Sequence, residues 1–211
     1  MLPQQLVSHL DQAKQYLDNS IDGDLPLHQR APILKLMGEG RPDLEASYPS
    51  YAPGHVRRYR LMKACAEKVL FIWEDIVPID KTPHLTLQIA DEFIQRDYPP
   101  DDGEMKPLLS RIISCVESNP DIGLVTLSGW SIINAFQICQ LDTDIWENEN
   151  ADAIEDIDDE IYGWSADFSA SLAYAGGFSG NPGANNNKRR EFWEWYLNQA
   201  AEEAYKSVCQ K

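Results

Sequence analysis

The run DIGLVTLSGWSIINAFQICQL, residues 121–141, carries no charged side chain after its first residue. Its length suits a helix, and its apolar residues point in more than one helical direction, as expected for a helix that neighbours cover. The polar residues that interrupt it would lack partners in a bilayer core. These are Thr126, Ser128, Ser131, Asn134, Gln137 and Gln140. We therefore predict a central, buried helix of a soluble protein.

Apolar residues recur every three or four positions on both sides of this run, which is typical of helices with one buried face. The expected helices cover residues 6–18, 33–37, 55–74, 82–97, 107–117, 161–174 and 188–208. Thr82 is the expected N-cap of its helix, with Pro83 at the first helical position. The predicted fold class is all-α: a single-domain bundle of about seven to nine antiparallel helices around the uncharged central helix.

One domain is expected over residues 1–211, because 43% hydrophobic content is enough to bury one core. Closely spaced prolines predict a less regular N-terminal part over residues 1–53. Small and turn-forming residues predict a mobile loop over residues 176–187.

The net charge of −16 argues against nucleic acid as a ligand, because phosphate binding depends on Lys and Arg. The first residues lack the basic and apolar regions of a secretory signal, and no membrane partner is expected. The cysteines lie far apart without a CxxC pair, which predicts reduced thiols in the core. They are Cys65, Cys115, Cys139 and Cys209. We therefore expect a cytoplasmic protein.

Residues 142–160, DTDIWENENADAIEDIDDE, hold ten carboxylates and no Lys, Arg or His. We call them the acidic segment. So many like charges repel one another, which leaves two interpretations: a solvated face, or a surface that meets a basic partner, with Trp146 as an apolar anchor. The predicted partner contacts are Asp144, Trp146, Glu147, Glu155, Asp156, Asp158 and Asp159.

A metal-dependent enzyme is the main alternative. Glu155 and Asp158, or Asp152 and Glu155, would share one face of a helix, and helical nucleotide pyrophosphohydrolases hold Mg²⁺ with such pairs. The complementary carboxylate pair on a second helix is missing, and no Lys or Arg lies nearby in the sequence to bind phosphate. The sequence also lacks HExxH and GxSxG motifs. We therefore expect no catalytic residue, cofactor or metal.

Two basic clusters remain, at residues 57–60 and 188–190. The second opens a helix, where positive charge meets the positive end of the helix dipole. Two interpretations stay open: the acidic segment relieves that charge, or all six basic side chains of the two clusters are solvated.

Two segments, residues 64–90 and 188–204, resemble the fifth numbered, all-helical immunity-protein family of bacterial polymorphic toxin systems. The matching residues are Ala64, Cys65, Trp73, Glu74, Pro78, Asp80, Pro83, Ala90, Arg190, Phe192, Trp193, Trp195, Tyr196 and Leu197. Together with the Ala-rich residues 170–177, the resemblance covers about half of the chain. The first fifty residues and the acidic segment are expected to lie outside it.

The resemblance implies a small cytoplasmic antidote that binds and blocks a cognate toxin. Together with the acidic segment, it leads us to expect an immunity-type binding protein that masks the active surface of a toxin with a basic surface. The alternatives are the Mg²⁺-dependent hydrolase and a non-inhibitory helical scaffold protein.

Overall fold

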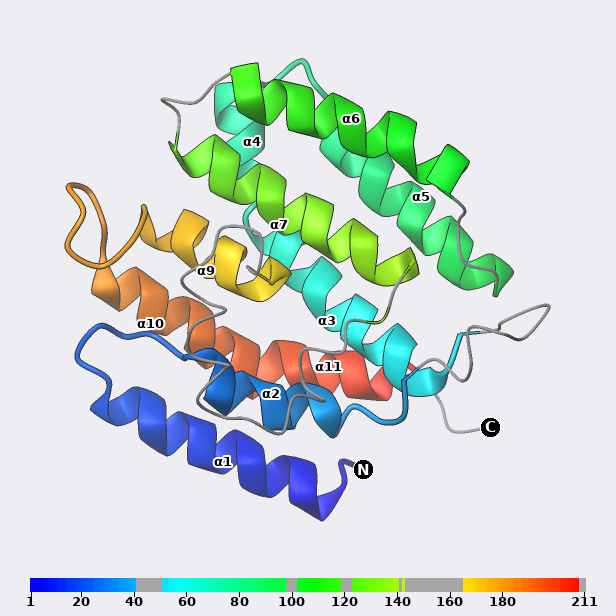
Figure 1. The fold of residues 1–211 in the computed structure, drawn as a ribbon. Helices are drawn as coiled ribbons and strands as arrows, with labels where there is room; N and C mark the ends of the chain where they lie inside the picture. The colour runs from blue at the N-terminus through cyan, green and yellow to red at the C-terminus, as the bar shows by residue number, and fades with distance from the viewer. Residues whose placement is uncertain (41–50, 98–101, 119–122, 141, 143–164, 209–211) are drawn as a thin grey trace.

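The computed structural model describes residues 1–40, 51–97, 102–118, 123–140, 142 and 165–208. Within these ranges the protein consists of helices joined by turns, without strands (Figure 1). The predicted all-α class is therefore confirmed. The elements are α1 (Gln4–Asn19), α2 (Leu27–Lys35), α3 (Pro53–Lys68), α4 (Leu70–Ile76), α5 (Thr82–Arg96), α6 (Asp102–Ser118), α7 (Gly123–Gln140), α9 (Ala166–Ala175), α10 (Asn186–Trp195), the π-helical turn η3 (Tyr196–Ala200) and α11 (Ala201–Lys206).

Helix α7 lies at the centre of the bundle and contacts α3, α4, α5, α6 and α9 (Figure 1). Phe136 of α7 is fully buried in the hydrophobic core. The hydroxyl of Ser131 donates to the Ala166 carbonyl at 2.7 Å, and that of Ser128 donates to the Val69 carbonyl at 3.2 Å. These polar groups therefore have partners inside the protein. The predicted uncharged central helix is confirmed.

The N-terminal part is more regular than its prolines suggest. Helix α1 ends at Asn19, close to the predicted position. Helix α2 begins at Leu27 instead of residue 33, because Pro26 occupies its N-cap, where a missing N–H breaks no helical hydrogen bond. Pro32 lies inside α2, and its carbonyl still accepts the N–H of Leu36 at 3.0 Å. The predicted start of this helix was wrong.

The predicted helix over residues 55–74 is divided into α3 and α4 at Val69, whose backbone leaves the helical region at φ −112° and ψ 6°. Helix α5 begins at Thr82 as predicted, but Thr82 does not cap it. The Asp80 carboxylate accepts the Thr82 N–H at 2.9 Å and the Thr82 hydroxyl at 2.5 Å. The acceptor that serves this helix start is therefore Asp80.

The predicted C-terminal helix consists of three consecutive helical segments, α10, η3 and α11. Asn185 caps it, since its side-chain oxygen accepts the N–H groups of Asn187 and Lys188 at 3.0 and 3.2 Å. The rings of Trp193 and Tyr196 meet edge to face, with centroids 5.4 Å apart, in the core. The predicted loop over residues 176–187 has a turn-rich backbone over residues 176–183 but ends at Asn185, because residues 186 and 187 already belong to α10. Its mobility stays a prediction.

Among the helices of the described ranges, none is both long enough and apolar enough to cross a bilayer. Cys65 and Cys139 are buried and Cys115 is half-buried, and none of these three forms a disulfide. Burial raises the pKa of all three thiols, which keeps them protonated at neutral pH. Cys209 lies outside the described residues.

Helix α7 packs closely against its neighbours at Gly129, which gives a test of the core. A Cβ atom there would lie 2.5 Å from Val116 Cγ2 and 3.1 Å from Trp73 Cζ3. We expect Gly129→Val to lower the free energy of unfolding by about 1–3 kcal/mol through overpacking. Urea denaturation would measure the loss. The control is Gly123→Val in the same helix, where a Cβ would meet nothing within 4 Å; an equal loss in both variants would contradict the proposed packing.

Candidate protein-binding site

The residues predicted to contact a partner lie outside the described residues. They are Asp144, Trp146, Glu147, Glu155, Asp156, Asp158 and Asp159. The carboxylate pairs considered for a hydrolase, which also involve Asp152, lie outside them as well. Of the acidic segment the structure describes Asp142, and the described chain resumes at Ser165. The structure therefore shows how the core holds the chain at these two positions.

Asp142 forms a buried ion pair with Arg58 of α3, in which the two side chains are 6% and 1% exposed. Arg58 Nε donates to Asp142 Oδ1 at 2.8 Å, and Nη2 donates to Oδ2. The remaining nitrogen, Nη1, donates to the carbonyls of Leu34 and Gly38 at 3.2 and 2.7 Å. This bidentate geometry is the strongest arrangement for an arginine and a carboxylate. It fixes the first residue of the acidic segment to α3.

Arg30 of α2 holds the chain at Ser165 and Asp167. Its side chain and that of Asp167 are both 0% exposed, and Nη1 lies 2.9 Å from Asp167 Oδ1. The same nitrogen donates to Ser165 Oγ at 2.8 Å, and Nε donates to the Leu25 carbonyl at 2.9 Å. The guanidinium carbon also lies 5.3 Å from the ring centroid of Trp193. Removing either charge of such a pair would leave the other one buried without compensation.

The first basic cluster is therefore largely internal, and the expectation of solvated side chains was wrong for it. Arg57 is 4% exposed, donates to the Met37 carbonyl at 2.8 Å and stacks over the Tyr205 ring at 3.9 Å. Arg60 is more exposed and donates to Asp91 at 2.8 Å. Backbone carbonyls and carboxylates accept these hydrogen bonds from the guanidinium groups of the cluster.

In the second basic cluster, backbone carbonyls accept hydrogen bonds from Arg189 and Arg190. Arg190 donates to the carbonyls of Leu17 and Ser20, at the C-terminal end of α1, where the helix dipole favours positive charge. Arg189 is buried and donates to the Gly177 carbonyl, while Lys188 is exposed. The interpretation that all of these side chains are solvated was wrong for two of the three.

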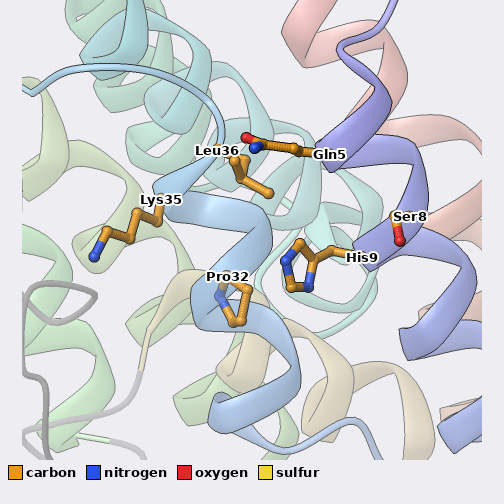
Figure 2. A pocket seen from close by; sticks show the side chains of 6 residues that line it. All are labelled: Gln5, Ser8, His9, Pro32, Lys35 and Leu36. Carbon is orange, nitrogen blue, oxygen red and sulfur yellow. The ribbon is translucent and has the colours of Figure 1, made fainter.

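A groove of about 360 Å³ lies between α1 and α2 (Figure 2). Its lining residues are Gln5, Ser8, His9, Pro32, Lys35 and Leu36. His9 and Gln5 point toward the space between the helices, whereas Lys35 extends away from them (Figure 2). His9 is the only acid–base group that points inward from this lining, and no carboxylate is present there to orient it. The lining of the groove therefore does not contain a histidine–carboxylate pair for acid–base catalysis.

Elsewhere in the described part of the chain, no group of three or more His, Cys, Asp and Glu side chains is placed to hold a metal ion. His84 of α5 contacts Glu74 of α4 at 2.8 Å, and His55 contacts the Ile138 carbonyl. These two histidines bind elements of the fold to one another.

A family described as immunity protein Imm5 matches residues 10–203 of the chain. The chain belongs to this immunity protein family. The suspected resemblance is confirmed, but its expected limits were wrong, because the match includes most of the first fifty residues and the whole acidic segment. A search of curated proteins gives no match.

The residues that carry the resemblance to Imm5 mainly build the core. Trp73, Phe192, Trp193 and Tyr196 are at most 1% exposed. Burial, and then the nearby Asp167 carboxylate, raise the pKa of the Tyr196 hydroxyl, so this residue stays neutral beside the Arg30 pair. Two residues of the resemblance, Trp193 and Tyr196, therefore lie beside the buried ion pair.

The anchor of the acidic segment in this Imm5 protein can be tested by stability measurements. We expect Asp142→Ala to lower the free energy of unfolding by about 3–5 kcal/mol, because it leaves the Arg58 charge buried without its partner. The control is Glu92→Ala, which removes an exposed pair with Arg96 at 3.5 Å and should cost less than about 1 kcal/mol. Similar losses in both variants, measured by urea denaturation, would show that the buried Arg58 pair contributes no more to the free energy of unfolding than an exposed pair.

Proposed function

We propose that this protein neutralises a cognate toxin by binding it and masking its active surface. Membership of the Imm5 immunity family over residues 10–203 is the observation that carries the proposal. The net charge of −16 supports a partner with a basic surface, because opposite charges accelerate diffusional encounter. A toxin that acts on nucleic acid would present such a surface in its substrate cleft.

The acidic segment is the proposed contact with the toxin. Its ten carboxylates are not accompanied by a positive side chain of the segment itself. Asp142, at its start, uses its charge internally on Arg58. The carboxylates proposed to meet Lys and Arg of the toxin are Asp144, Glu147, Glu155, Asp156, Asp158 and Asp159. Trp146 would add an apolar anchor, because aromatic residues at the centre of an interface slow dissociation.

The proposed place of action is the cytoplasm, where the toxin would meet its target. Free thiols at Cys65 and Cys139 support a reducing compartment, because cytoplasmic proteins keep such groups reduced.

Bacterial growth tests neutralisation directly. An antidote is usually encoded immediately downstream of its toxin, so the toxin to test is the polypeptide encoded immediately upstream of this chain's gene. It is produced in bacteria from an inducible promoter, with and without this protein. We expect growth arrest by the upstream polypeptide alone and recovery on co-expression. Arrest that persists in the presence of the protein would contradict the proposal.

Charge reversal tests the acidic segment. We expect Asp156→Lys, Asp158→Lys and Asp159→Lys together to leave the fold intact and to abolish capture of the upstream polypeptide, measured by calorimetry. The matched control reverses three exposed carboxylates of the described helices, Glu117, Glu191 and Glu194, and changes the net charge by the same amount. Unchanged capture by the first variant would place the interface elsewhere, and equal losses would indicate net charge instead of local contacts.

Salt dependence tests electrostatic steering. We expect the association rate with the upstream polypeptide to fall on the order of tenfold or more between low and high ionic strength, because salt screens surface charges. The dissociation rate should change much less. Stopped-flow fluorescence would measure both rates, and a salt-independent association rate would contradict steering by the acidic segment.

A further inference from the structure

Helix α4, the first turn of α5 and the turn that joins the two helices expose several large apolar side chains. Phe71, Ile76, Ile79 and Leu85 are 49%, 39%, 94% and 45% exposed. We call these four residues the α4–α5 corner; the turn lies at the top of Figure 1. Single exposed apolar residues are ordinary, but several of them on two elements that the Glu74–His84 contact holds together indicate an interaction site.

The corner is held in place from its inner side. Trp73 of α4 is buried against α7. Rotation of α4 that turned its exposed side inward would remove Trp73 from the core. Glu74 accepts hydrogen bonds from His84 at 2.8 Å and from Lys81 at 3.4 Å, which ties α4 to the start of α5. Asp80 fixes the intervening turn through the Thr82 N–H. A surface that is already ordered loses little conformational entropy on binding.

The charges beside the corner indicate the kind of partner. Glu74 and Asp75 lie in α4 between Phe71 and Ile76, and Asp75 is exposed. Hydrogen bonds from His84, and then from Lys81, lower the pKa of Glu74, so this carboxylate is ionised at neutral pH, where it pairs with Lys81. Apolar side chains next to carboxylates match an apolar patch flanked by Lys or Arg. A second copy of this chain is disfavoured, because two molecules of charge −16 repel one another.

We infer that the α4–α5 corner is a contact surface for the cognate toxin, and that it receives an apolar patch of the toxin flanked by basic side chains. The inference rests on the proposed function and adds a second surface to it. Trp73 of α4 packs beside Gly129, in the N-terminal half of α7, whereas Asp142 follows the C-terminal end of that helix. The corner and the anchored start of the acidic segment are therefore separate places on the protein.

The two most exposed isoleucines of the described residues provide a matched experiment. Ile79, in the corner, is 94% exposed, and Ile21, in the turn between α1 and α2, is 93% exposed. We expect Ile79→Ser to weaken binding of the upstream polypeptide by about tenfold or more, as an apolar residue at the centre of an interface does. Ile21→Ser should leave the affinity unchanged. Both variants should unfold within about 0.5 kcal/mol of the wild type, because neither side chain is packed.

Phe71→Ser is a second variant in the corner and should weaken binding in the same direction. Calorimetry with the upstream polypeptide measures affinity, and light scattering after size-exclusion chromatography measures the oligomeric state of the protein alone. Wild-type affinity in both corner variants would overturn the inference and leave the proposed function standing. A wild-type dimer that Ile79→Ser dissociates, with toxin affinity unchanged, would assign the corner to a second copy and also overturn it. If the wild type itself does not bind, the proposed function fails, and the inference fails with it.

Discussion

A guanidinium group buried in a protein interior must find opposite charge and hydrogen-bond acceptors, and this constraint organises the centre of the molecule. Arg30 is fully buried, and its partners come from three parts of the chain: the Leu25 carbonyl, the Asp167 carboxylate of α9 and the Trp193 ring of α10. These elements must meet for Arg30 to be satisfied. Since breaking a buried pair costs about 3–5 kcal/mol, an arrangement that separates them would lose much of the stability of a small domain.

Burial of arginines also shapes the surface. Within the described residues, Arg30, Arg57, Arg58 and Arg189 are at most 4% exposed. Their charges are satisfied by internal carboxylates and carbonyls, so they do not offset the carboxylates on the outside. Their burial leaves carboxylates in excess on the exterior, which suits a protein proposed to attract a basic partner.

The resemblance to the Imm5 family and the proposed function depend on different side chains. Trp73, Phe192, Trp193 and Tyr196, which carry the resemblance, fill the core. Binding of a partner depends on exposed groups, which core packing does not constrain. A family match can therefore establish the fold together with the membership, whereas the acidic segment and the α4–α5 corner have to be argued from charge and exposure.

The sequence by itself determined the helical class, the central position of α7 and the approximate extent of most helices, because hydrophobic periodicity is a local property of the chain. It did not determine the break at Val69, the start of α2 at Leu27 or the role of Asp80 at the start of α5, since each depends on the packing or hydrogen bonding of particular neighbours. Only the tertiary structure decided the partners of the basic clusters. Arg30 and Asp167 are 137 residues apart in the chain, and Arg58 and Asp142 are 84 apart. No local pattern relates residues at such separations, because they meet only when the helices that carry them pack together.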